Sequence, residues 1–226
     1  MNKGNRKLDN DPHYDAIIKL VAEGIKDNED NVNRILDKNL VPYITKILKS
    51  SSWEHNRYIP LLNLVARLSN AQEAAADMYI DSNIHTILIG QIRKSLIIYK
   101  KHNSLFEESS ADSISHQMLK YQTLAAEITA LGGLLQGGEE KRECIIDDVI
   151  VLDIINFMSH SKTDPILLTS VCTFARDLFE CKELRYNKSR MQPYFDKMAN
   201  MKYMVPYMGL ERYPDLLQMS QRYHDA

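Results

Sequence analysis

Helix-breaking residues are scarce in this chain of 226 residues, which has 8 glycines and 7 prolines. Long stretches between them repeat apolar residues at i, i+3 and i+4, a spacing that is typical of α-helices. Hydrophobic residues make up 44% of the chain and charged residues 26%. This balance allows a sizeable core and excludes disorder of the whole chain. The composition therefore predicts an all-α protein.

Cysteines are also few, and Cys144, Cys172 and Cys181 form no CxxC pair and lack metal-ligand spacing. A disulfide framework or a structural zinc site is therefore not expected. No stretch approaches the roughly 18 uncharged apolar residues of a membrane span. The first seven residues lack the apolar region of a secretory signal. We expect a protein of the cytoplasm or the nucleus, without a membrane span.

Neither sign of charge dominates, because 28 basic residues stand against 30 acidic ones for a formal net charge of −2. This balance gives no reason to expect nucleic acid or an anionic membrane as the main partner. The motifs GxGxxG, GxxxxGK, HExxH and GxSxG are all missing. The paired glycines Gly132-Gly133 and Gly137-Gly138 are interpreted as a close helix contact and a helix stop. No catalytic residue, cofactor or metal site is predicted.

A repeated pattern is what the chain does contain. Residues 36–48 recur as residues 80–92 and again as residues 146–158, at offsets of 44 and 66 residues. The helices that precede these stretches align at the same offsets, with a last offset of 44 to residues 172–178. A period of about 40–47 residues is that of solenoid repeats, whose units stack because none can bury its apolar face alone.

Each unit is expected to contain a long helix, a turn, a short helix, a tight corner and a further helix. Asn39 and Asn83 stand at two corners, where asparagine tolerates the left-handed conformation that ends a helix. Pro42 follows in the first turn of the next helix, where its missing N–H costs little. Matching acidic residues occur after the long helices, at Glu29, Glu73, Glu139 and Glu183.

The corner and the helix after it resemble the armadillo repeat, in which a glycine precedes a helix of the form x-[VIL]-x-x-[LI]-[VI]-x-[LI]-[LM]. Residues 39–48, 83–92 and 149–158 fit that form. Asn39, Asn83 and Val149 replace the corner glycine, so the repeats are degenerate. The resemblance covers about residues 14–194 and implies an all-α fold, a right-handed α-solenoid of about four armadillo-like repeats.

We divide the chain into a flexible N-terminus (residues 1–13), an armadillo-like repeat domain (residues 14–199) and a Met/Tyr-rich C-terminal cap or tail (residues 200–226). The longer offset adds 22 residues, placed in a polar, serine-rich stretch at about residues 100–116. This insertion is expected to be a surface loop or an extended helix end, either without a role or with a regulatory or partner-binding one.

The resemblance implies a protein–protein interaction module (a scaffold, adaptor or regulatory subunit) and not an enzyme. In armadillo proteins the last helix of each repeat lines a concave groove that holds an extended partner segment. The matching polar positions are Lys19, Glu23, Lys26, Asn63, Arg67, Asn70, Thr129, Gln136, Thr173, Asp177 and Glu180. An asparagine ladder, typical of peptide-binding members, is absent. The stripe becomes acidic at the fourth unit, which would suit a basic end of the partner.

Two other interpretations stay open at the level of sequence. One is a regulator of a chaperone or small GTPase that acts as a nucleotide-exchange factor, because armadillo-like folds serve in both. The other is a helical enzyme with an unrecognised site, which a cluster of buried titratable residues in a closed pocket would favour. Four repeats make a small array, so the chain could be one domain of a longer protein. The sequence predicts neither the partner's identity nor the oligomeric state.

Overall fold

The structure is a computed structural model that describes residues 24, 30, 31, 33, 34, 41–50, 58–103, 111–157 and 164–198. Within these ranges the chain forms helices and no strand. The predicted all-α class is therefore confirmed. Among the predicted elements, the corner at Asn39 lies outside the described residues, as do residues 1–13 and 200–226.

The helices follow the expected order of a long helix, a short helix and a helix after a corner. The described elements are α3 (Val41–Ser50), α4 (Tyr58–Ala71), α5 (Glu73–Asp81), α6 (Ile84–Asn103), α7 (Ala111–Leu134), α8 (Glu139–Ile146), α9 (Ile150–Asn156), α10 (Pro165–Glu180), α11 (Lys182–Arg185) and α12 (Lys188–Met198). In this order α4, α7 and α10 take the place of the expected long helix, α5, α8 and α11 that of the short helix, and α6, α9 and α12 that of the helix after the corner. We refer to α4, α7 and α10 as the long helices, although α6 with its 20 residues is longer than α4 and α10.

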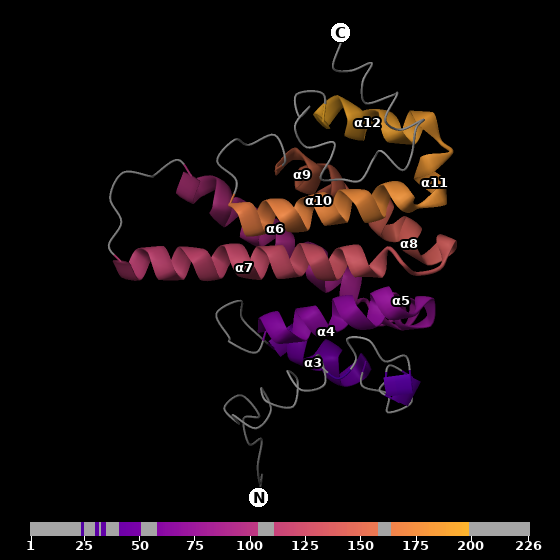
Figure 1. Cartoon of the computed structure of the whole chain (residues 1–226), viewed down its shortest axis with the longest axis horizontal. Coiled ribbons are helices and arrows are strands. Elements are labelled where there is room, and N and C mark those ends of the chain that lie inside the picture. Colours follow the sequence, from indigo (N-terminus) through magenta and orange to yellow (C-terminus); the bar gives the residue numbers. More distant parts are fainter. Residues whose placement is uncertain are drawn as a thin grey trace, which may run out of the picture.

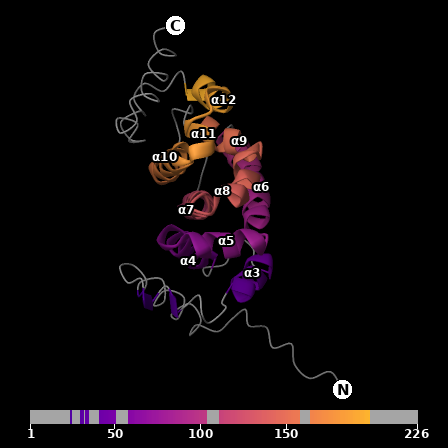
Figure 2. The ribbon, with the colours of Figure 1, turned by 90° about the vertical axis from the view of Figure 1, so that its right-hand side faces the viewer.

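The long helices lie side by side, because α4 packs on α7 and α7 packs on α10. Figure 1 shows α7 between its two neighbours, with the short helices α5, α8 and α11 at one end of the three. A second row follows the order α3, α6, α9 and α12, in which each helix contacts the next. Figure 2 shows this second row on the opposite side of the molecule from α4, α7 and α10.

The core fills the space between the two rows. Tyr99 of α6 is buried at its centre, with its ring centroid 5.1 Å from that of Tyr121 in α7 and 4.8 Å from that of Phe157 after α9. Tilted and edge-to-face rings at these distances add stabilisation beyond the area they bury. The aromatic contacts therefore tie the second row to the first at the middle of the molecule.

Two adjacent glycines hold α7 close to both of its neighbours. A Cβ on Gly133 would lie 3.0 Å from the Cα and the carbonyl oxygen of Ala66 in α4. A Cβ on Gly132 would lie 3.4 Å from the Phe174 ring and 3.6 Å from the Asp177 carboxylate, both in α10. The predicted close packing at these glycines is confirmed. The offsets of 66 and 44 residues define equivalent positions in successive units. Each of these contacts joins two residues that lie within two positions of being equivalent in this sense.

The corner between α5 and α6 contains the predicted left-handed residue. Asn83 has a φ of 60°, the only positive φ of a non-glycine residue within the described ranges. Its N–H donates a hydrogen bond to the carbonyl of Ile80 at 2.9 Å, which closes the end of α5. The next corner is built differently, because Val149 is right-handed with a φ of −53° and Asp148 accepts a bond from the Ile150 N–H.

Gly137 and Gly138 lie between α7 and α8, as predicted for a helix stop. A Cβ on Gly137 would lie 3.0 Å from Oδ1 of Asp77 in α5. The N–H of Gly138 donates a hydrogen bond to that same oxygen at 2.8 Å. Because these two glycines have no side chains, Asp77 of α5 can approach the start of α8, the short helix of the following unit.

The inserted stretch at about residues 100–116 is helical at both ends. Helix α6 has 20 residues and runs to Asn103, while α7 has 24 residues and begins at Ala111. Residues 104–110 between them lie outside the described residues. The additional residues of the longer offset thus go at least partly into longer helices, which is one of the two forms expected for the insertion.

Ion pairs join successive units near their short helices. Lys141 of α8 pairs with Asp81 of α5, and Arg190 of α12 reaches back to the acidic end of α8. Arg142 binds Glu183 of α11 in a bidentate pair, with N–O distances of 2.7 and 2.9 Å. Both of these side chains are mostly buried, so solvent screens this pair less than an exposed one. Glu183 was singled out by the repeat alone, and the structure gives it an interface role.

Replacing Gly133 with alanine should destabilise the chain, because the new Cβ would meet the Ala66 backbone, which cannot move aside by a rotamer change. We expect a loss of about 1–3 kcal/mol in the free energy of unfolding, measured by urea denaturation. Gly132→Ala is the matched control, because its Cβ would meet mainly a side chain at an ordinary contact distance. Equal stability of the two variants would contradict the close approach of α4 and α7.

Candidate partner-binding surface

The outward sides of α4, α7 and α10 form the surface on which most of the predicted site residues lie. Each helix buries one side and leaves polar residues on the other, as amphipathic helices at a protein surface do. We call this surface the long-helix face; Figure 2 shows its three helices along one side of the molecule. Its members are Asn63, Arg67, Asn70, Thr129, Gln136, Thr173 and Glu180.

Helix α7 contributes only a narrow strip to the long-helix face. Between residues 123 and 136 every residue is buried except Thr129 and Gln136, which are half-buried. The Thr129 hydroxyl donates a hydrogen bond to the carbonyl of Ala125 at 2.8 Å, which leaves its oxygen able to accept one. The central strip of the face is therefore polar and uncharged, with amphipathic helices on both sides.

The flanking helices carry the charges and most of the exposed amides. Asn63 and Asn70 of α4 are exposed and Arg67 is half-buried between them. On α10, Thr173 is half-buried and Glu180 is exposed. The predicted residues Lys19, Glu23 and Lys26 lie outside the described residues, so the face is described for three units. Its charge changes from basic on α4 to acidic at the end of α10, as the sequence indicated.

Asp177 corrects one expectation, because it does not face solvent. The residue is only 7% exposed, and its Oδ1 accepts hydrogen bonds from the Arg176 guanidinium at 2.8 and 3.1 Å. Burial raises the pKa of this carboxyl above its usual range, while Arg176 opposes that shift. The close approach of α7 through Gly132 covers Asp177 from the side. Glu180 therefore carries the acidic end of the face.

Three residues of the surface were missed by the sequence reasoning. Arg176 is partly exposed beside Asp177, and two apolar side chains, Met118 of α7 and Ile166 of α10, are about half exposed. Arg176 could have been found from the sequence, because it directly precedes Asp177, an acidic residue of the predicted polar stripe. The sequence did not indicate that Met118 and Ile166 are exposed, because an isolated apolar residue of a helix has the same sequence pattern whether it is buried or exposed.

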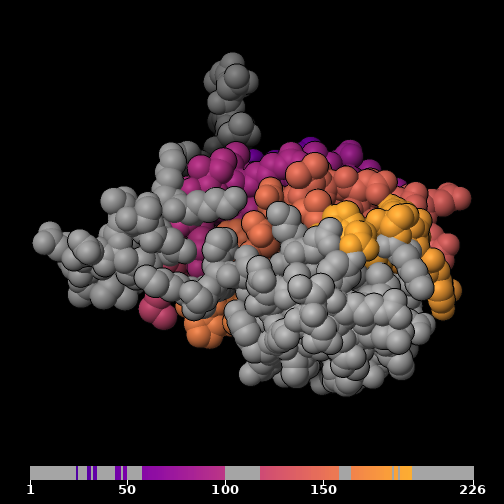
Figure 3. Space-filling model, turned by 90° about the horizontal axis from the view of Figure 1, so that it is seen from above, coloured from indigo at the N-terminus to yellow at the C-terminus, as the bar shows by residue number. Residues whose placement is uncertain are grey.

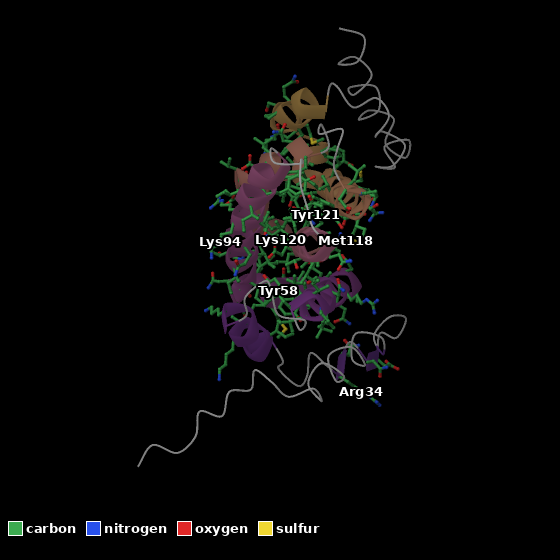
Figure 4. All side chains as sticks on the ribbon, turned by 90° about the vertical axis from the view of Figure 1, so that its left-hand side faces the viewer. Arg34, Tyr58, Lys94, Met118, Lys120 and Tyr121 are labelled. Carbon is green, nitrogen blue, oxygen red and sulfur yellow. The ribbon has the colours of Figure 1, made fainter. Side chains whose placement is uncertain are left out.

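A buried carboxyl lies in the core between α4, α6 and α7. Glu127 has no exposed surface, and its Oε2 accepts a hydrogen bond from the Ser95 hydroxyl at 3.0 Å. Among the described residues no hydrogen-bond partner is found for its Oε1, and the same holds for the buried Tyr58 hydroxyl. Burial raises the pKa of Glu127 to about 7, against the opposing effects of Ser95, Tyr58 and Lys94. Figure 4 shows Tyr58 among interior side chains and Lys94 at the outer edge.

The buried carboxyl bears on the enzyme alternative, which called for buried titratable residues in a closed pocket. Glu127 is sealed, and Tyr58 beside it is 1% exposed. A catalytic carboxylate has to reach its substrate, so we interpret this pair as a polar part of the core. The sequence contained a signal for it, since Glu127 lies three or four residues from the buried Leu124 and Leu131 and thus on an apolar side of α7.

Other site types find no support in the part of the chain that the structure describes. No group of three or more His, Cys, Asp or Glu side chains there could hold a metal ion. None of the helices in the same ranges combines the length and the apolar character that crossing a bilayer requires. Cys172 and Cys181 are buried, and burial raises their pKa values to about 11 and about 12.

The raised pKa of Glu127 should make stability depend on pH. The folded state holds this proton more tightly than the unfolded state. The contribution of Glu127 to the free energy of unfolding is therefore fully present below about pH 4.5 and is lost as the pH rises through 7. The loss is about 3 kcal/mol for a shift of this size. Glu127→Gln should remove it, so that the variant is the more stable protein at pH 8 in urea denaturation. An unchanged pH slope in the variant would contradict the assignment.

Comparison of the chain with protein-family models finds no match, and neither does comparison with curated proteins. The long-helix face remains as the candidate binding surface. Its described part is a polar face built from three stacked helices, basic on α4, uncharged on α7 and acidic at the end of α10.

Proposed function

We propose that this chain is a protein–protein interaction module, built as a short right-handed armadillo-like solenoid, that binds a partner segment along the long-helix face. The stacking of α4 on α7 and of α7 on α10 supports this proposal. Stacked units turn the outward positions of separate helices into one continuous surface, which a single globular pocket would not provide. A scaffold, an adaptor or a regulatory subunit would use such a surface.

The narrow polar strip of α7 is the observation that carries the proposal. Thr129 in the buried C-terminal part of α7 and Gln136 just after the helix are the accessible groups, and the amides of Asn63 and Asn70 occupy the equivalent positions of the α4 unit. Amide side chains both donate and accept hydrogen bonds, which is what the N–H and C=O groups of an extended peptide require. An extended partner segment could therefore lie along the strip and satisfy its backbone there.

The charges of the face would orient the partner. Arg67 lies on α4, while Glu180 lies exposed at the end of α10. Asp177 is paired with Arg176, so it adds little to the field outside. A partner segment with a basic end over α10 and an acidic or neutral end over α4 complements this pattern. Complementary charges of this kind set the orientation and the association rate more than the affinity.

Reversing the charge of Glu180 should weaken binding to the partner. The protein would be used to capture partners, and the affinity of a purified partner would then be measured for Glu180→Lys by isothermal titration calorimetry. We expect a loss of about three- to tenfold, which is typical of one exposed charge at an interface rim. Asp177 is not a suitable substitution site, because its side chain is buried beside α7 and a change there would also disturb the packing.

Glu140→Lys is the matched control, because Glu140 is exposed on α8 and outside the long-helix face. Both variants change the net charge by the same amount, so a general electrostatic effect would weaken both equally. Wild-type affinity for Glu180→Lys, or an equal loss for Glu140→Lys, would count against the long-helix face as the binding surface.

A further inference from the structure

Gly90 lies in the middle of α6 without a neighbour that requires a glycine. A Cβ at this position would meet no atom of the described residues within 4 Å. Glycine inside a helix costs about 1 kcal/mol relative to alanine. Gly133 has a structural reason for that cost, because the Ala66 backbone would lie 3.0 Å from a Cβ there. Gly90 has no such reason among the described residues, and its backbone is partly exposed on the surface of α6.

The helices around Gly90 are one-sided in charge. Neither α3 nor α6 contains an acidic residue, although the chain as a whole has more acidic than basic residues. Lys46 and Lys49 of α3 are exposed, and so are Arg93 and Lys94 of α6. Helix α3 packs on α6, and the 44-residue offset aligns Lys46 with Gly90. Exposed lysines therefore lie on both of the contacting helices, and Gly90 between them in the repeat pattern has a partly exposed backbone.

An exposed apolar side chain completes this surface. Ile97 is 56% exposed, and it lies seven residues after Gly90 and three after Lys94, so all three share one side of α6. Figure 4 shows Lys94 at the outer edge of the molecule, and Figure 2 shows α3 and α6 on the side away from the long-helix face. We call the set Lys46, Lys49, Gly90, Lys94 and Ile97 the α6 surface.

The basic region ends at the next unit. Arg93 is partly neutralised by an ion pair with Asp148 at 2.7 Å, at the corner before α9. Asp153 of α9 is half-buried just beyond it. Seen from above in Figure 3, the magenta α6 runs along one edge of the described residues, beside the orange segments that follow it in the chain.

We propose that the α6 surface docks an acidic segment of a partner protein, whose backbone passes over Gly90. Carboxylates of that segment would pair with Lys46, Lys49 and Lys94, and an apolar side chain would cover Ile97. A polypeptide fits better than a nucleic acid, because no aromatic side chain described on α6 is exposed for base stacking. This surface lies on the other row of helices, so the inference does not depend on the proposed function of the long-helix face.

A displayed library of random peptides would test the inference, with the full chain as bait. Wild type should enrich peptides rich in Asp and Glu that also contain one apolar residue. Gly90→Gln should not enrich these peptides, because the glutamine side chain would occupy the space in which the peptide backbone is proposed to lie. The fold should tolerate this side chain, because no described atom lies near a Cβ at this position. For the most enriched peptide, fluorescence anisotropy should show at least a tenfold loss of affinity with Gly90→Gln and with Lys94→Glu, at unchanged helical circular dichroism.

Matched controls separate this docking from other charge effects. Glu180→Lys on the long-helix face should leave the affinity for the acidic peptide unchanged, and a peptide with Gln in place of each Glu should not bind. The inference would be overturned if no acidic peptide were enriched, or if Gly90→Gln bound the enriched peptide as well as wild type does. It would also be overturned if the chain bound only phosphatidylserine vesicles or single-stranded RNA, or if it self-associated and Gly90→Gln abolished the self-association.

Discussion

The close approach of α7 to both neighbouring long helices is the contact on which the rest of this structure depends. Gly133 leaves room for the Ala66 backbone on one side, and Gly132 leaves room for Phe174 on the other. Because both glycines lie in one turn, α4 and α10 are brought against α7 at the same level. The three helices thereby share a register, and their outward residues form one surface instead of three.

The same approach determines which polar groups remain available. It buries Asp177 against α7, where Arg176 holds its carboxylate, and it leaves Thr129 of α7 and Gln136 just after the helix as the accessible groups. The ion pairs between units, such as that of Arg142 with Glu183, lie at the end where the short helices meet. Structural charges are thus gathered at the short helices, while the long-helix face keeps mainly amides, hydroxyls and a few exposed charges.

The two rows of helices present different chemistry to the outside. The long-helix face is mixed in charge and rich in amides, which suits an extended backbone. The row with α3 and α6 is basic and has an exposed helix backbone at Gly90, which suits an acidic segment. A chain with two such surfaces on opposite rows could hold two partners at once, which is the defining property of an adaptor.

The sequence by itself determined the helices, their order and their register, because the 3.6-residue pattern, the corner at Asn83 and the glycine pairs are local features that act within a few residues. It also located most polar positions of the long-helix face. Only the tertiary structure decided that Asp177 and Glu127 are buried, since the burial of a polar residue depends on which helix packs across it. It likewise decided that Gly133 is approached closely by the Ala66 backbone while no described atom comes near Gly90, because the difference is made by neighbours far away in the chain.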